Sequence, residues 1–212
     1  GDGADDHNIT GVGFQPDWTW IKCRSNADSH ALYDAVRGAT KFLMSNSNSL
    51  EQTEADALVS FDSDGFTLDD DATGTRVNVD TRTYASWNWK AGGASTVTNN
   101  DGSIESEVSV NTTAGFSIFT YTGTGAAGTV GHGLSSKPDM IIFKGRNTTS
   151  SWPVYYERTD AGALGFPLLE SDAIKIDSSF TWNSTVFTFA SASGYSNTSL
   201  TNYIAYAFQS IE

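Results

Sequence analysis

The chain contains one run of sequence features twice. Residues 11–24 contain a Gly-rich turn, a Pro-Asp corner, an apolar run and then a Lys-x-Arg sequence, here called the Lys-x-Arg exit because it follows the apolar run. The same four features recur at residues 131–146, and Pro16 and Pro138 lie 122 positions apart. Three further matches follow in the same order, namely 31–34 with 153–156, 61–67 with 180–188, and 84–89 with 203–208. Four matches in one order and at a nearly constant offset predict an internal duplication. We therefore expect the chain to consist of two copies of one structural unit.

The secondary structure that this pattern predicts is all-β. Short apolar runs such as 18–22, 115–121 and 203–208 alternate between two faces or are apolar on both, and turns rich in Gly, Asn and Asp separate them. Aromatic residues make up 12% of the chain and charged residues 17%, which suits a strand-rich protein with an aromatic core and argues against a helical bundle or a disordered chain. Only 31–39 and 50–58 have any spacing compatible with a short helix. We expect two tandem, internally duplicated antiparallel β-sandwich lobes.

The domain boundary is expected at the Gly-containing connector that begins at Ala91. This divides the chain into a first β-sandwich repeat, 1–93, and a second one, 94–212. The predicted strand at 115–121 precedes the second Gly-rich turn, and its counterpart in the first copy would lie just upstream of residue 1. This suggests that the chain is a fragment, or that a neighbouring copy supplies the missing strand, since an unpaired sheet edge invites aggregation.

The charge and the cysteine content exclude several classes of function. The net charge of −13 and the pI near 4.4 oppose binding to nucleic acid, because phosphate contacts need Lys and Arg, and they oppose electrostatic attachment to an anionic membrane. The sequence has no apolar run of the ~18–20 residues that a membrane span needs. Cys23 is the single cysteine, so there is no internal disulfide, and we expect it to be a small buried strand residue.

Catalytic chemistry is not predicted. Glu105 and Glu107 would share one face of a strand and could in principle cleave a glycosidic bond as an acid and a nucleophile ~5 Å apart. However, they lie beside a turn with few aromatic residues nearby. The histidines His7, His30 and His132 are far apart in the sequence and form no metal-binding or triad pattern. We therefore expect no catalytic residues and no enzyme activity.

A cluster of aspartates around Gly65 is the one candidate for metal binding. Asp62, Asp64, Asp69 and Asp71 are hard oxygen ligands in turn-like sequence, which is what calcium prefers. The spacing is not that of an EF-hand, because one loop ligand and the Glu at the twelfth position are absent. A solvated acidic turn without a metal is therefore the favoured interpretation, and calcium binding is the alternative. We expect no cofactor, with calcium at this turn as the one candidate.

The tryptophans are the candidates for carbohydrate binding. An exposed indole ring can stack on the face of a sugar, while Asp and Asn accept hydrogen bonds from its hydroxyls. Trp18 and Trp20 share one face of a predicted strand, and core positions are the alternative for most of the six tryptophans. Trp152 and Trp182 adjoin turns rich in Ser, Thr and Asn, so we expect these two, with Asn183, to lie at the surface and to bind glycan.

The sequence resembles a family of repeats found in tail and other structural proteins of marine bacteriophages, notably those that infect cyanobacteria. The resemblance covers essentially the whole chain and is carried by long motifs. These read Gly-Val-Gly-Phe-Gln-Pro-Asp-Trp-x-Trp-Ile-Lys at 11–22, Leu-Tyr-Asp-x-Val-Arg-Gly-Ala-Thr-Lys at 32–41, Phe-Asp-Ser-Asp-Gly-Phe-Thr-Leu at 61–68, Trp-Asn-Trp-Lys-Ala-Gly at 87–92 and Gly-Phe-Ser-Ile at 115–118. The resemblance implies a concanavalin-like (jelly-roll) β-sandwich, repeated within longer virion proteins.

The function expected from this resemblance is structural and adhesive. The chain would be a non-enzymatic module of a phage tail or fibre on the virion surface or otherwise extracellular, contacting host-surface polysaccharide. Its other partners would be copies of itself or other virion proteins, with neither nucleic acid binding nor membrane insertion. One alternative is a purely architectural self-assembling or capsid-decoration subunit. A polysaccharide depolymerase is the alternative from another class.

Overall fold

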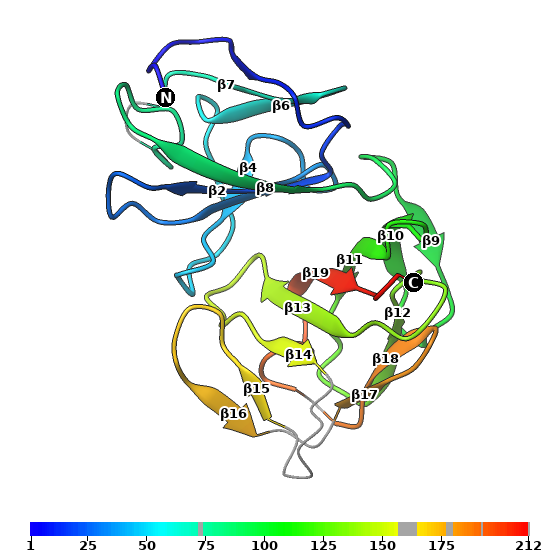
Figure 1. Cartoon of the computed structure of the whole chain (residues 1–212). Coiled ribbons are helices and arrows are strands. Elements are labelled where there is room, and N and C mark those ends of the chain that lie inside the picture. Colours follow the sequence, from blue (N-terminus) through cyan, green and yellow to red (C-terminus); the bar gives the residue numbers. More distant parts are fainter. Residues whose placement is uncertain (72–73, 157–164, 177–179, 192, 212) are drawn as a thin grey trace. The chain divides into compact units, whose positions relative to one another are not determined.

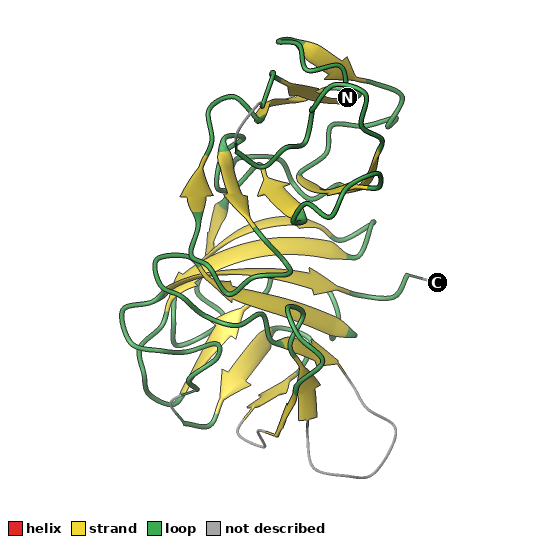
Figure 2. Cartoon of the chain, turned by 90° about the vertical axis from the view of Figure 1, so that its left-hand side faces the viewer, coloured by secondary structure: helices red, strands yellow, loops and turns green. Residues whose placement is uncertain are grey.

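A computed structural model describes residues 1–71, 74–156, 165–176, 180–191 and 193–211. All regular secondary structure in these ranges is β-strand, and Figure 2 shows strands and loops without a helix among them. The predicted all-β class is therefore confirmed. Residues 31–39 and 50–58, where a short helix was compatible with the spacing, instead contain the strands β3 (Ala31–Asp34) and β5 (Gln52–Thr53). No helix in the described ranges is long and apolar enough to cross a membrane.

The chain divides into two compact units, Gly1–Ala94 and Ser95–Glu212, here called unit 1 and unit 2. The division lies one residue from the boundary expected from the sequence. Each unit is an antiparallel β-sandwich with its own sheets and its own apolar core.

Unit 1 consists of a five-stranded sheet and a three-stranded sheet (Figure 1). The order in the larger sheet is β5-β4-β3-β2-β8, and in the smaller one β1-β7-β6. Besides β3 and β5, the strands are β1 (His7–Ile9), β2 (Trp18–Cys23), β4 (Lys41–Leu43), β6 (Leu58–Asp62), β7 (Gly65–Leu68) and β8 (Tyr84–Trp89).

The core of unit 1 lies between these two sheets. Tyr33 and Ile21 contribute from the larger sheet, and Phe66 and Leu68 from the smaller one. Alternation in β2 directs Ile21 inward, which places Trp18 and Trp20 together on the opposite face of the sheet. Cys23 is buried in β2, as predicted.

Unit 2 consists of a six-stranded sheet, a three-stranded sheet and a two-stranded ribbon, with orders β14-β13-β19-β11-β10-β9, β12-β18-β17 and β15-β16. The six strands of the largest sheet are β9 (Val97–Asn99), β10 (Ser106–Asn111), β11 (Phe116–Thr122), β13 (Met140–Gly145), β14 (Val154–Tyr156) and β19 (Asn202–Phe208). The others are β12 (Gly128–Gly131), β15 (Gly165–Pro167), β16 (Ile174–Ile176), β17 (Phe180–Trp182) and β18 (Val186–Phe189).

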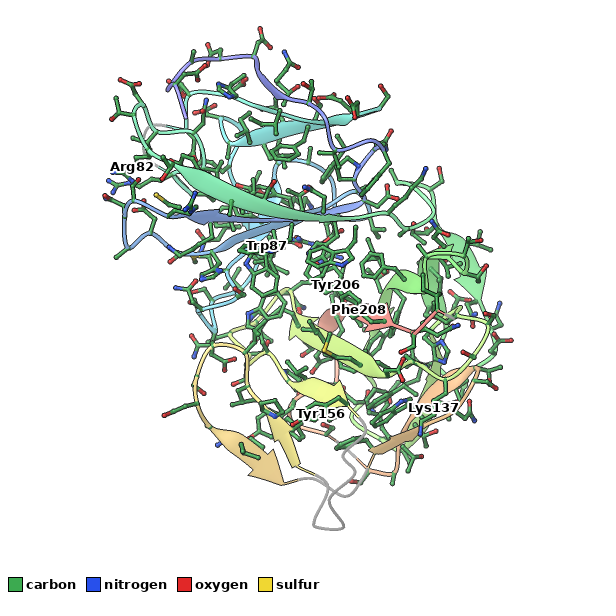
Figure 3. The ribbon with its side chains drawn as sticks, in the orientation of Figure 1. Arg82, Trp87, Lys137, Tyr156, Tyr206 and Phe208 are labelled. Atoms are coloured by element: carbon green, nitrogen blue, oxygen red, sulfur yellow. The ribbon has the colours of Figure 1, made fainter. Side chains whose placement is uncertain are left out.

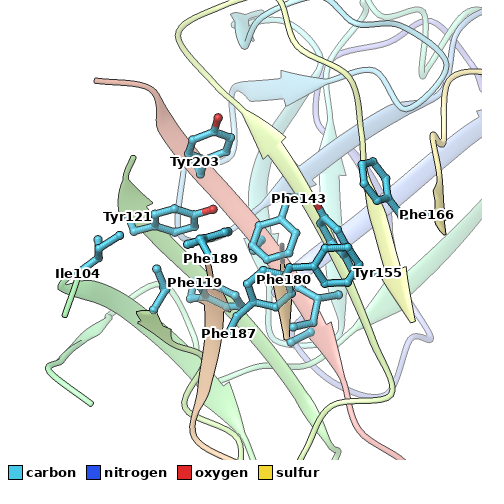
Figure 4. Packing of buried hydrophobic residues seen from close by; sticks show 14 of the residues in the cluster. Ile104, Phe119, Tyr121, Phe143, Tyr155, Phe166, Phe180, Phe187, Phe189 and Tyr203 are labelled. Carbon is cyan, nitrogen blue, oxygen red and sulfur yellow. The ribbon is translucent and has the colours of Figure 1, made fainter. Parts of the chain in front are cut away.

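The core of unit 2 is built mainly from aromatic rings (Figure 4). Phe143 is its centre: its ring centroid lies 5.0 Å from that of Phe187 and 5.4 Å from that of Tyr155. Phe119 meets Phe143 edge to face at 6.1 Å. Rings of this size each bury roughly 150–250 Å², so a few of them supply most of the apolar burial of the unit.

The two units have matching strand orders and registers. In unit 1 the order β3-β2-β8 corresponds to β14-β13-β19 in unit 2, and β1-β7-β6 corresponds to β12-β18-β17. Trp18 pairs with Trp89 where Met140 pairs with Phe208, so the offsets are 122 and 119 residues, the values expected from the sequence matches. The internal duplication remains our inference, and these equal registers support it.

The Pro-Asp corner has the same structural role in both units. The backbone N–H of Asp17 donates to the carbonyl of Trp89, and its carboxylate accepts a hydrogen bond from the N–H of Ala91 at 2.7 Å. In unit 2 the N–H of Asp139 donates to the carbonyl of Phe208, and its carboxylate accepts from the N–H two residues further on, at 2.5 Å. The aspartate therefore caps the end of the neighbouring strand, which explains why the dipeptide occurs twice.

The lysine of the Lys-x-Arg exit also recurs in one role. Lys22 donates to three carbonyl oxygens of the loop that follows β2, those of residues 23, 26 and 28. Lys144 donates to the carbonyl of Ser150 at 2.5 Å, in the loop that follows β13. In each unit an ammonium group thus holds the loop that leaves the strand. Burial lowers the pKa of Lys144 to about 8.

Candidate functional site

Trp152, which the sequence placed at the surface, is fully buried, so that expectation was wrong. Its exposed fraction is 0%, and its backbone N–H donates to the Glu170 carboxylate at 3.0 Å. The ammonium of Lys144 lies 5.6 Å from the centre of the indole ring. The ring therefore covers a buried cation, and it has no surface to offer to a sugar.

Trp182 is partly buried and is also a packing residue. Its ring stacks on Phe180 and Phe187, each at 5.8 Å. Its indole N–H donates to the carbonyl of Pro138 at 2.7 Å, and the ammonium of Lys137 lies 5.4 Å from the ring centre. The ring, its polar atom and its cation neighbour are thus all engaged, which corrects the expectation of a sugar-binding platform here.

Asn183 caps the turn between β17 and β18. Its side-chain oxygen accepts hydrogen bonds from the backbone N–H groups of Thr185 and Val186, at 2.8 and 2.9 Å. The Thr185 hydroxyl donates to the same oxygen at 3.0 Å. An Asn with this bonding pattern stabilises a local turn, and its acceptor is already used.

The four aspartates proposed as calcium ligands serve different local partners. Asp64 accepts from the N–H groups of Gly11 and Gly13, at 3.0 and 2.6 Å, and so closes the Gly-rich turn in which both glycines have positive φ. Asp62 accepts from the hydroxyls of Ser60 and Thr67.

The remaining two aspartates bind backbone and hydroxyl donors elsewhere. Asp69 accepts from the N–H of Asp6 at 3.1 Å, and Asp71 accepts from Thr75 and from the N–H of Val77. Within the described ranges, no three His, Cys, Asp or Glu side chains come together as metal ligands. The acidic segment thus organises turns of unit 1, and this chemistry does not require a metal.

The paired glutamates are held by threonines. The Glu107 carboxylate accepts from the hydroxyls of Thr98 and Thr96, at 2.6 and 2.8 Å, and these hydrogen bonds lower its pKa. Both glutamates line a polar hollow of about 230 Å³ together with Arg146. A carboxyl group with a lowered pKa is ionised at neutral pH, so Glu107 is poorly suited to donate a proton to a leaving group.

The strongest candidate site is an aromatic hollow on unit 1, lined by Trp20, His30, Trp87 and Trp89, with a volume of about 260 Å³. Its tryptophans come from the paired strands β2 and β8, and His30 lies directly before β3. The antiparallel register places Trp20 opposite Trp87 and Trp18 opposite Trp89, so the four indoles share one face of the sheet. Figure 3 shows Trp87 projecting from β8, and 48% of its surface is exposed.

Trp87 packs against one neighbouring ring of the aromatic hollow and is half-exposed. Trp20 and Trp87 are edge to face, with centroids 6.4 Å apart and an interplanar angle of 71°. Trp18 is buried and packs against Trp89 at 4.4 Å, which fixes the floor of the hollow. An indole held in this way loses little rotamer freedom when a ligand stacks on it.

His30 supplies the polar group of the aromatic hollow. Its Nδ1 accepts a hydrogen bond from the indole N–H of Trp20 at 2.8 Å, so the proton of the neutral ring is on Nε2. Burial lowers the pKa of His30, which keeps the ring neutral at physiological pH. Nε2–H is then a donor that a ligand hydroxyl can use.

A second, polar hollow of unit 1 shares His30 with the aromatic one. It has a volume of about 520 Å³, and its charged lining residues are Asp28, Glu54 and Arg76. Asp28 forms ion pairs with Arg76, at 3.6 Å, and with Arg82. An aromatic surface beside a hollow of polar groups is the combination that a sugar requires, because sugars present both C–H faces and hydroxyls.

The sequence analysis recognised the tryptophans as candidates, but it placed at the surface two that the structure buries or packs against the core. Its rule was proximity to polar turns, which favoured Trp152 and Trp182. The missing signal was the pairing of β2 with β8, which places two Trp-x-Trp segments side by side in one sheet. His7, His30 and His132 do not form a common cluster with acidic ligands in the described part of the chain.

Comparison with known proteins identifies a family but no individual relative. No curated protein and no solved structure matches the chain. A family model described as "Domain of unknown function (DUF7483)" matches residues 1–212, which include both units. The chain therefore belongs to the DUF7483 family.

Proposed function

We propose that this protein is a non-enzymatic adhesion module of a virion surface structure, such as a phage tail or fibre, and that it binds host-surface glycan in the aromatic hollow of unit 1. The observation that carries the binding proposal is the half-exposed Trp87 ring held against Trp20 and next to the donor of His30. The virion location rests on the resemblance of the motifs, two of which contain the Trp-x-Trp segments that line the hollow.

The size of the aromatic hollow suggests one sugar ring as the bound unit. At about 260 Å³ it is slightly smaller than the ~300 Å³ at which small-molecule pockets begin, and it is open rather than enclosed. A monosaccharide at the end of a chain, or one exposed residue within a polysaccharide, fits such a site. The adjacent polar hollow would contact the neighbouring sugar through Asp28, Glu54 and Arg76.

The proposal is tested by titrating the full chain with a panel of bacterial surface polysaccharides while tryptophan emission is recorded. Binding should quench or shift the emission, and Trp87→Ala should weaken binding at least tenfold. Tyr156→Ala is the matched control, because Tyr156 is an exposed aromatic strand residue of unit 2, with 38% of its surface accessible. Equal affinity of Trp87→Ala and the unchanged protein would refute the site. Equal losses in both variants would indicate nonspecific adsorption.

The pH dependence of binding provides a second test of the same site. Protonation of His30 removes the Nδ1 acceptor of the Trp20 N–H and reorients the ring. Since burial lowers the pKa of His30 below its usual 6.5, affinity should be constant around neutral pH and should fall only under more acidic conditions. His30→Gln should abolish this acid dependence.

The alternative function is architectural self-assembly without glycan binding. The native mass of the protein in solution, with and without calcium, separates the two functions. A discrete monomer or trimer favours the adhesion module, whereas polymers would make assembly the main function. For the depolymerase alternative, the lowered pKa of Glu107 speaks against this residue as the general acid.

A further inference from the structure

The polar hollow of unit 1, about 520 Å³ in volume, contains charged side chains that differ in how they are paired. Asp28 forms ion pairs with two guanidinium groups, those of Arg76, at 3.6 Å, and of Arg82, which lies outside the lining of the hollow. Glu54 differs, because in the described part of the chain neither a hydrogen bond nor an ion pair reaches its carboxylate. The hollow therefore presents one negative charge that the described residues leave uncompensated.

Glu54 has a defined position in the polar hollow. Its backbone N–H, directly after β5, donates to the carbonyl of Thr40 at 2.9 Å. Its side chain lies against Gly74, because a Cβ on that glycine would be 2.1 Å from Oε2 of Glu54. Lys41 of the adjacent strand β4 forms its ion pair with Glu51, at 3.9 Å. Backbone contacts rather than a counter-ion thus position the Glu54 carboxylate.

A second carboxylate, that of Asp71, lies one hydrogen bond behind the wall of the polar hollow. The hydroxyl of Thr75, a lining residue, donates to Oδ2 of Asp71 at 2.9 Å. Asp71 is 1% exposed, and its Oδ1 has no hydrogen-bond partner in the described part of the chain. Burial and, to a smaller extent, the charge of Glu54 raise the pKa of Asp71. Two carboxylates that oppose each other's ionisation favour a cation beside them.

The residue that links the polar hollow to the aromatic hollow does not oppose a cation either. His30 lines both hollows, and burial lowers its pKa, so the ring is neutral at physiological pH. The faces of indole rings, such as that of the half-exposed Trp87, attract cations. The net charge of −13 also favours the encounter of the chain with a cationic ligand.

These charges discriminate between classes of sugar. A sugar hydroxyl can donate a hydrogen bond to Glu54, but it leaves the negative charge in place. A uronic acid would add a like charge to the hollow. The ammonium group of an amino sugar supplies both the donor and the opposite charge, and hydrogen bonds of this kind are about twice as strong as those between neutral groups.

We propose that the sugar in the polar hollow is an amino sugar with a free ammonium group, which binds the carboxylate of Glu54, while a neighbouring ring of the same glycan stacks on Trp87. The inference rests on the proposed glycan binding in the aromatic hollow, and it names the class of glycan that the two hollows select together. The ligand is a polysaccharide that contains amino sugars without N-acetyl groups.

The test compares two oligosaccharides that have the same backbone, namely a short β-linked glucosamine oligomer and the same oligomer with every amine acetylated. Each is titrated into the full chain while tryptophan emission is recorded, at a pH at which the free amines are protonated. The glucosamine oligomer should bind about tenfold more tightly or better. This preference should shrink as the salt concentration rises, because ions screen a charge pair that is open to solvent.

The variant Glu54→Gln keeps the shape of the side chain and removes its charge. It should abolish the preference for the glucosamine oligomer and leave the affinity for the acetylated oligomer unchanged. Asp56→Asn is the matched control, because Asp56 is exposed, lies outside the lining of the hollow and gives the same change in net charge. This control should retain the preference. Trp87→Ala should weaken the binding of both oligomers by the same factor.

The outcomes separate this inference from the proposed function. Equal affinities of the two oligomers for the unchanged protein, with weaker binding of both to Trp87→Ala, would overturn the amino-sugar inference and support the aromatic site. Equal losses of preference in Glu54→Gln and Asp56→Asn would also overturn it, because net charge would then explain the preference. If neither oligomer binds, the inference fails, and the polysaccharide panel with Trp87→Ala decides the proposed function independently.

Discussion

Asp17→Ala is the most direct test of the idea that the Pro-Asp corner holds each sheet together. Asp17 is 2% exposed, and Oδ2 of its carboxylate accepts hydrogen bonds from the N–H groups of Ala91 at 2.7 Å and Gly93 at 3.2 Å. Alanine would leave the buried N–H of Ala91 without its acceptor, at the point where the chain leaves β8.

The magnitude follows from two opposing contributions. Hydrogen bonds to a charged group each contribute roughly 1.5–3 kcal/mol, so the loss of two would cost about 3–6 kcal/mol. Burial of the carboxylate raises the pKa of Asp17, which shows that the charge is itself costly, and alanine removes that cost. We expect a net loss of about 2–4 kcal/mol in the free energy of unfolding of unit 1. Asp17→Asn keeps an oxygen acceptor and should cost about 1 kcal/mol or less.

The assay is urea unfolding followed by tryptophan emission, which reports mainly on unit 1 because four of the six tryptophans lie in it. Asp139→Ala is the matched variant in unit 2, where the carboxylate accepts one such bond, from Ser210, and the loss should be about half as large. A loss below about 1 kcal/mol for Asp17→Ala, or equal losses for the alanine and asparagine variants, would refute the reasoning.

The sign of the pH dependence gives an independent check on Asp17. Since the pKa in the folded protein is raised, the folded state binds more protons than the unfolded chain in the window just above pH 3.8. The contribution of this group to stability is therefore present at low pH and is lost as pH rises through the folded pKa. Asp17→Asn should lack this component, and its stability relative to the unchanged protein should improve as pH rises.

Three further predictions concern His132, Lys144 and Gly65. Burial lowers the pKa of His132, so the unfolded chain binds more protons below pH 6.5, and the urea midpoint of unit 2 should fall on acidification in the unchanged protein but not in His132→Gln. Burial lowers the pKa of Lys144 from 10.5 to about 8, so the free energy of unfolding should rise by up to about 3 kcal/mol as the pH increases from about 8 to 10.5. The variant Lys144→Met should lack this rise, and the control Lys22→Met should retain it. A Cβ at Gly65 would lie 1.8 Å from a carbonyl oxygen of β1, so Gly65→Ala should lower the melting temperature far more than Gly38→Ala, where nothing lies within 4 Å.

Much of the fold could be predicted because its signals are local. The apolar run of β2 and the strongly aromatic runs of β11 and β19 have the alternation or two-sided burial that identifies strands. The two copies of the Pro-Asp corner indicated one pattern used twice, and the registers of the two units agree with that interpretation. The short strands β5 and β9 carried too little pattern to be recognised.

The candidate site was predicted poorly because exposure is a tertiary property. Trp152 and Trp182 have the polar neighbours in sequence that suggested a surface position. In the structure, Trp152 covers the ammonium of Lys144, and the indole N–H of Trp182 donates to the carbonyl of Pro138. Neither partner is adjacent in sequence, so no local rule could have found these contacts.

The sequence by itself determined the all-β class, the two-part organisation and the residue types available for binding, because periodicity, turn residues and composition act over short distances. Only the tertiary structure decided which tryptophans share one face of a sheet and which donors the aspartates around Gly65 bind. The physical reason is that strand pairing joins residues far apart in the chain: Trp20 meets Trp87 through a register that no short segment encodes. The aromatic hollow is a consequence of that pairing.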